Sequence, residues 1–188
     1  MRTRRIGIAV GALLLLSTLG PATLTAHSSS ATYDYHVGDA LLQEIGFPVG
    51  DQAMADNGDV VTIVGTGSFS SDGKWADGGG TFSHLVAASN ATITGTWTAD
   101  GLISFAFYGC GEEGFPDDFC GGQLKLAITA TPDAAPNVHL AGALTIVCVA
   151  APNVPAAAVE GVRVNVYDVI NFNKTVPESG ANIYILQP

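Results

Sequence analysis

Apolar and polar side chains alternate along most of the chain after residue 58. In residues 91–99, Ile93 and Trp97 point to one face while four threonines point to the other. A period of two is typical of a β-strand with one buried face, and threonine suits the solvated face because its branched side chain fits the pleat. The pattern predicts about eight strands, at 60–69, 80–86, 91–99, 102–108, 124–130, 138–149, 162–166 and 183–186.

Turn-forming sequences separate the predicted strands. Asp100-Gly101 lies between two alternating runs, and both positions tolerate the positive φ of a type I′ hairpin turn. A longer connection at 70–80 carries Trp75, and a proline-containing one spans 131–137. Because short turns join neighbouring strands in antiparallel fashion, we expect an all-β antiparallel barrel of about eight strands. A two-sheet β-sandwich is the alternative.

The segment 27–57 shows a weaker pattern than the rest. Tyr33 and Tyr35 alternate with polar residues, which suggests an edge strand. Residues 39–47 have apolar side chains at helical spacing and end in Gly-Phe-Pro, so they predict the chain's one clear helix. We therefore divide the chain into a partly irregular segment at 27–57 and a β-domain at 58–188.

The first 26 residues have the anatomy of a secretory signal peptide. Three arginines precede an apolar run at 6–16, and a small-residue stretch ends near Ala26. The run has 11 residues, whereas a membrane-spanning helix needs about 20. We expect cleavage after Ala26 and a secreted, extracellular protein without a membrane span.

Charge narrows the range of partners. The chain has 17 acidic and seven basic residues. Three of the basic residues precede position 26, so the predicted mature chain carries four basic and 17 acidic residues, a formal net charge of −13. Such an acidic chain repels phosphate backbones, which argues against a nucleic-acid partner.

The three cysteines are Cys110, Cys120 and Cys148. Cys110 and Cys120 bracket a glycine-rich loop whose ends leave and re-enter strands, and an exported chain permits disulfides. Joining them would stabilise the fold by about 2.5–3 kcal/mol in the chain-entropy model. Cys148 shares a face with two aliphatic residues and looks like a buried small hydrophobe. We expect a Cys110–Cys120 disulfide, with a bridge from either to Cys148 as the alternative.

The same loop is the candidate metal site. It carries four carboxylates, and carboxylate oxygens are the ligands that calcium prefers. The spacing of a calcium-binding loop is absent, however, so solvated side chains are the simpler interpretation and no cofactor is expected. The four weak candidates are Glu112, Glu113, Asp117 and Asp118.

Catalytic motifs are missing from the sequence. Neither the nucleophile elbow GxSxG nor the zinc-protease motif HExxH occurs. His84 shares a strand face with Phe82, so it is either an acid or base inside a barrel or a hydrogen-bonded strand histidine. A barrel cavity would be lined by residues such as His84, Phe105 and Phe107. Trp75 is a candidate platform for stacking against a sugar.

Several short sequences resemble a group of secreted all-β proteins without an assigned activity. They are GGGTFSH at 78–84, GTWTA at 95–99, YGCG at 108–111, FCGG at 119–122 and NFNK at 171–174. The glycine-punctuated run at 65–69 is similar to strands of dirigent and allene oxide cyclase barrels. That similarity implies an eight-stranded barrel holding a small apolar ligand.

Three functional hypotheses remain. The preferred one is a secreted binding or structural β-domain without catalysis, because the strand pattern is clear and catalytic motifs are absent. The first alternative is a barrel enzyme or carrier of a small hydrophobic molecule, and the second is a carbohydrate-binding module.

Overall fold

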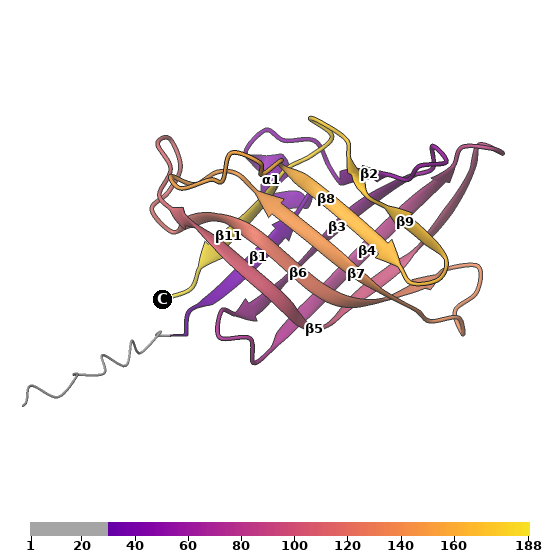
Figure 1. Cartoon of the computed structure of the whole chain (residues 1–188), viewed down its shortest axis with the longest axis horizontal. Helices are drawn as coiled ribbons and strands as arrows, with labels where there is room; N and C mark the ends of the chain where they lie inside the picture. The colour runs from indigo at the N-terminus through magenta and orange to yellow at the C-terminus, as the bar shows by residue number, and fades with distance from the viewer. Residues whose placement is uncertain (1–29) are drawn as a thin grey trace, which may run out of the picture.

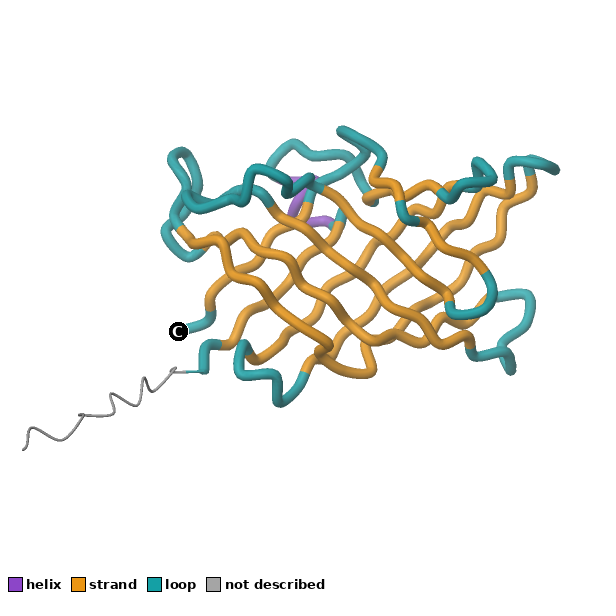
Figure 2. Tube along the Cα trace, in the orientation of Figure 1, coloured by secondary structure: helices purple, strands orange, loops and turns teal. Residues whose placement is uncertain are grey.

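A computed structural model describes residues 30–188, so the predicted signal peptide lies outside the described residues. The regular secondary structure of the described chain is almost entirely β-strand, with one short helix (Figures 1 and 2). The elements are β1 (Thr32–Val37), α1 (Ala40–Glu44), β2 (Asp51–Met54), β3 (Val60–Ser70), β4 (Ala76–Val86), β5 (Ala91–Cys110), β6 (Phe119–Pro132), β7 (Leu140–Cys148), β8 (Gly161–Val166), β9 (Ile170–Phe172), β10 (Lys174–Thr175) and β11 (Asn182–Leu186).

All eleven strands belong to one antiparallel sheet, which confirms the predicted fold class. Strands β3, β4, β5 and β6 pair in sequence order. Strands β1 and β11 pair with each other and connect β3 back to β6, so the pairings form a closed circuit. Beyond it, β7, β8 and β9 continue from β6, and β2 and β10 continue from β3. This circuit is compatible with a barrel or a sandwich.

The predicted hairpin at Asp100-Gly101 is wrong. Residues 91–110 form the single long strand β5, which pairs with β6 on both sides of this dipeptide. The pairing shifts register between Ala99 and Gly101, so Asp100 is the extra residue of a β-bulge. Its Oδ2 accepts a hydrogen bond of 2.8 Å from the Thr129 hydroxyl on β6. A dipeptide suited to a turn therefore serves here as an irregularity within a strand.

Four other parts of the sequence prediction also need correction. Strand β1, predicted as an edge strand, lies between β3 and β11, and its Tyr35 is fully buried. Strand β2 was not predicted. Residues 78–80, assigned to a connection, belong to β4 and pair with β3 and partly with β5. The predicted helix at 39–47 is correct in place but shorter, and Asp39 Oδ1 caps it by accepting the Leu42 N–H at 3.3 Å.

The core has an aromatic part that side chains fill. Phe105 packs edge-on against Phe69 and Tyr184, with ring centroids 4.6 and 5.5 Å apart. Tyr33 stacks on Phe69 at 5.3 Å. Such aromatic pairs add stability beyond the area they bury. The Cys110–Cys120 disulfide is present between β5 and β6, as expected.

Candidate functional site

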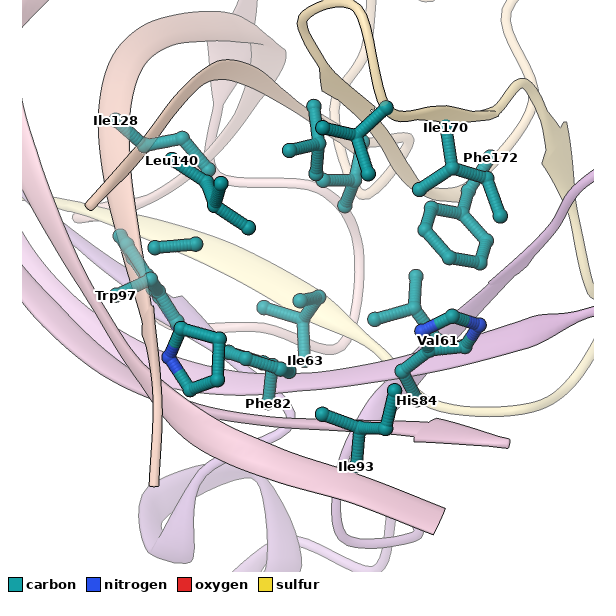
Figure 3. Close-up of a pocket in the computed structure, with 15 residues that line it drawn as sticks. Val61, Ile63, Phe82, His84, Ile93, Trp97, Ile128, Leu140, Ile170 and Phe172 are labelled. Atoms are coloured by element: carbon teal, nitrogen blue, oxygen red, sulfur yellow. The ribbon is translucent and has the colours of Figure 1, made fainter. Parts of the chain in front are cut away.

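An apolar pocket lies between β3–β6 and the β7–β9 segment, in a different part of the core from these aromatic rings. Its volume is about 180 Å³, and aliphatic and aromatic side chains form nearly all of its wall (Figure 3). The lining residues are Val61, Ile63, Phe82, His84, Ile93, Trp97, Ile128, Ala130, Pro132, Leu140, Val164, Val166, Val169, Ile170 and Phe172.

Strand alternation explains why so many strands contribute to one apolar surface. The lining positions are spaced by two or four residues on β3, β4, β5, β6, β8 and β9. Pairing places them opposite one another, as for Ile63 and Phe82, and for Trp97 and Ala130. Successive residues of a strand point to opposite faces, so these positions share one face of the sheet. The pocket is therefore a direct consequence of the hydrophobic pattern.

Trp97 forms one wall of the pocket and is 2 % exposed. Its indole Nε1 donates a 3.1 Å hydrogen bond to the Val64 carbonyl oxygen, which satisfies the ring's polar atom. Gly65 lies beside the indole, and a Cβ atom there would overlap the ring. Glycine at this inward position of β3 therefore makes room for Trp97.

His84 is the one titratable side chain among the residues that line the pocket. Its Nε2 lies 2.9 Å from Oδ2 of Asp59, which immediately precedes β3. The pairing of β3 with β4 places Val61 opposite His84, and Asp59 shares the face of Val61, so the two groups meet. The His84 ring also packs edge-on against Phe172, with centroids 5.1 Å apart.

Asp59 is held as a carboxylate. Its Oδ1 accepts the Ala87 N–H at 2.9 Å, while Oδ2 faces His84. The Ala87 N–H, followed by the His84 ring, lowers the pKa of Asp59 below its ordinary value. Because an ionised carboxylate only accepts hydrogen bonds, the proton in the Asp59–His84 contact belongs to Nε2.

A second polar cluster lies away from this pocket. Asp51 is 1 % exposed, and its Oδ2 accepts a 2.7 Å hydrogen bond from Nδ2 of Asn182. The same Nδ2 lies 3.2 Å from Oε1 of Glu160. Glu160 Oε2 accepts the Val149 N–H at 2.7 Å. No salt bridge within residues 30–188 involves either carboxyl group.

Burial dominates the electrostatics of this cluster. Desolvation raises the pKa of Glu160 to about 7, although hydrogen bonds from the Val149 and Asn182 N–H groups oppose the change. Desolvation also raises the pKa of Asp51. A cavity of about 340 Å³ adjoins the cluster and is lined by Glu160, Asn182, Glu112 and mostly apolar residues.

The structure separates the three residues expected to line one cavity. His84 lies in the wall of the apolar pocket, but Phe105 and Phe107 do not. Phe105 packs in the aromatic core, and Phe107 is 52 % exposed with its ring 6.0 Å from that of Tyr33. The extra residue between Leu102 and Ser104 changes the alternation of β5, so Ile103 is exposed as well.

The other candidate residues are dispersed. Glu113, Asp117 and Asp118 are exposed, and Glu112 lines the cavity beside Glu160. The described part of the chain contains no group of three or more His, Cys, Asp or Glu side chains arranged to hold a metal ion. Trp75 is 41 % exposed in the turn between β3 and β4. Cys148 is buried and its thiol is free. Burial raises the pKa of this thiol above its ordinary value.

Sequence reasoning missed Asp59 and Phe172 as partners of His84. Asp59 lies 25 residues before His84, and Phe172 lies 88 residues after it. Only the register of β3 against β4 and the return of β9 bring them together. The cluster of Asp51, Glu160 and Asn182 was missed for the same reason.

Comparison with protein-family models, curated proteins and solved structures gives no match to this chain. Among residues 30–188, no helix has the length and apolar character needed to cross a membrane.

Proposed function

We propose that the protein binds a small, mainly apolar molecule in the pocket between β3–β6 and β7–β9, without converting it chemically. The observation that carries this proposal is the pocket itself, with an apolar wall and one titratable side chain, His84. Small-molecule sites are commonly concave and apolar, with a few placed polar groups.

The size of the pocket limits the ligand. A dry cavity of about 150 Å³ with an aliphatic and aromatic wall holds benzene in a well-studied case. The volume of about 180 Å³ therefore suits a molecule with a single ring or a short branched chain. Burial of its apolar surface supplies the affinity, at roughly 25 cal/mol per Å².

A catalytic role is the second candidate, because an Asp–His pair can act as a general base. Carriage without conversion is favoured because the pocket wall supplies a single titratable group. The two functions separate experimentally, since a carrier returns its ligand unchanged after prolonged incubation and an enzyme does not.

Export to an oxidising compartment forms part of the proposal. Disulfides persist mainly outside the cytosol, and the Cys110–Cys120 bond supports an extracellular location. The arginine-led apolar segment at the start of the sequence supports it independently.

Two isoleucines of β5 provide a matched test of the binding site. Ile93 lines the pocket and is 40 % exposed, whereas Ile103 is 48 % exposed and lies outside the pocket. Binding of toluene is followed by methyl NMR shifts and by calorimetry. We expect binding to the wild type and to Ile103→Trp, and at least tenfold weaker binding to Ile93→Trp because the larger side chain occupies the pocket. Equal binding to both variants would place the toluene site elsewhere.

A further inference from the structure

The cavity of about 340 Å³ beside Glu160 differs in chemistry from the apolar pocket. Its apolar wall comes from α1 and the segment after it, from the loop between β5 and β6, and from β11. These side chains are Leu42, Ile45, Phe47, Phe115 and Ile183. The two charged residues that line it, Glu112 and Glu160, are both acidic and both half-buried. The wall therefore combines hydrophobic surface with negative charge.

Glu160 is surrounded by hydrogen-bond donors but not by positive charge. Its two oxygens accept N–H groups, as described above. The other titratable groups that act on it are Asp51 on β2, Cys148 on β7 and Tyr184 on β11, which are all neutral or negative. No Lys, Arg or His among residues 30–188 forms an ion pair with Glu160. Because charges in protein interiors are normally paired, this carboxyl group lacks its usual kind of partner.

An acceptor without a donor lies in the same wall. Asn182 lines the cavity and is 3 % exposed. Its Nδ2 is within 3.2 Å of the Val147 carbonyl oxygen and of Glu160 Oε1, and it donates to Asp51 as well. Within residues 30–188, however, no donor reaches its Oδ1. A buried acceptor without a partner is costly, so Asn182 points independently to a ligand that carries N–H donors.

An organic cation fits these features better than a metal ion. Calcium takes six to eight oxygen ligands, whereas the described residues hold no group of three or more His, Cys, Asp or Glu side chains suited to a metal. An ammonium group brings several N–H donors and needs few acceptors. Its apolar body would cover the hydrophobic part of the wall. The excess of acidic over basic residues in the chain also attracts cations over longer distances.

We propose that this cavity binds an organic ammonium ion with an apolar body, whose charged group pairs with Glu160 and lies beside Asn182. It is a second ligand site, because its lining residues and those of the apolar pocket have no member in common. The inference does not depend on the function proposed above.

The test compares 2-phenylethylammonium with 2-phenylethanol, which has the same apolar body and a neutral hydroxyl group. Calorimetry at pH 8.5 gives the ammonium-to-alcohol affinity ratio, at a pH where a carboxyl group with a pKa of about 7 is ionised. We expect the ratio to fall about tenfold in Glu160→Gln, because a charge-assisted hydrogen bond is lost. Glu113→Gln is the matched control, since it removes the same charge from an exposed residue outside the cavity and should keep the wild-type ratio. An equal fall in both variants would overturn the pairing with Glu160.

Two measurements on the unaltered protein do not depend on how well Glu160→Gln folds. The affinity for the ammonium ion should fall about 100-fold between pH 8.5 and pH 5, because protonation of a group with a pKa of about 7 competes with the cation. The affinity for the alcohol should change little. Methyl NMR should show shifts at Ile45 and Ile183 on addition of the ammonium ion, and none at Ile93 in the apolar pocket.

The outcomes separate this inference from the proposed function. Shifts at Ile93 alone, or alcohol that binds as tightly as the ammonium ion, would show that the inference is wrong. If calcium chloride at the same concentration reproduces the shifts at Ile45 and Ile183, the ligand class is wrong. Failure of toluene to bind the wild type overturns the proposed function alone, because toluene and the ammonium ion are assigned to different cavities.

Discussion

The buried carboxyl group of Glu160 should make the protein less stable as the pH rises from 5 to 8.5. Burial raises its pKa to about 7 in the folded chain, compared with 4.5 for an unperturbed glutamate. The folded state therefore binds more protons than the unfolded state in this range. Linkage then requires the free energy of unfolding to fall with increasing pH. The stabilisation is complete below pH 4.5 and is lost as the pH passes through about 7.

The magnitude follows from the difference between the two pKa values. Each unit corresponds to 1.36 kcal/mol, so a difference of about 2.5 units gives roughly 3 kcal/mol across the window. Asp51, whose pKa burial also raises, adds a contribution of the same sign. Asp59 and Asp72 have lowered pKa values, so their contributions are lost only at more acidic pH, outside this window.

Urea unfolding at pH 5, 6, 7 and 8.5, followed by tryptophan fluorescence, measures this effect in the wild type and in Glu160→Gln. The amide does not titrate, so the loss of stability between pH 5 and 8.5 should be about 3 kcal/mol smaller in Glu160→Gln. The substitution also removes the hydrogen bond from the Val149 N–H. This loss lowers the stability of the variant by the same amount at every pH, so the dependence of its free energy of unfolding on pH is unaffected. Glu178→Gln, at an exposed position, is the control and should follow the wild type. Parallel curves for the wild type and Glu160→Gln would refute the reasoning.

Three further substitutions test the packing by urea unfolding. Gly65→Ala should cost about 1–3 kcal/mol because the added methyl group overlaps the indole of Trp97, and an unchanged midpoint would contradict this packing. Leu144→Ala removes a fully buried side chain and should cost about 2–5 kcal/mol, while a loss below 1 kcal/mol would mean that the site collapses around the deletion. Replacing Cys110 and Cys120 together by serine should cost about 2.5–3 kcal/mol, with the wild type under reducing conditions as the comparison.

The alternation of side chains determined the class of fold. Val61, Ile63 and Trp97 are buried, and the threonines between Ile93 and Trp97 are exposed, as a period of two requires. Local chemistry also sufficed for the disulfide, because Cys110 and Cys120 flank one loop between strands. The fold class and the disulfide depend on residues that are close together in the sequence, so both could be predicted from the sequence alone.

Tertiary structure decided the conformation where strand pairing outweighed a local preference, and where the local sequence indicated no partner. The turn preference of Asp100-Gly101 is weak compared with the pairing of β5 to β6 on both sides of it, so the dipeptide became a bulge. Whether β1 was an edge or a central strand depended on β11, which closes the circuit of pairings from the far end of the described chain.

The candidate site divides in the same way. His84 could be identified from the sequence as a polar residue on an apolar strand face, and the hydrophobic pattern supplied most of the wall around it. Asp59 and Phe172 could not be identified as its neighbours from the sequence. Asp59 lies 25 residues away and meets His84 through the register of β3 against β4, whereas Phe172 lies 88 residues away and meets it because β9 returns to this part of the fold. Alternation along a strand is a local property, whereas the partners of a side chain are set by which strands the folded chain places side by side.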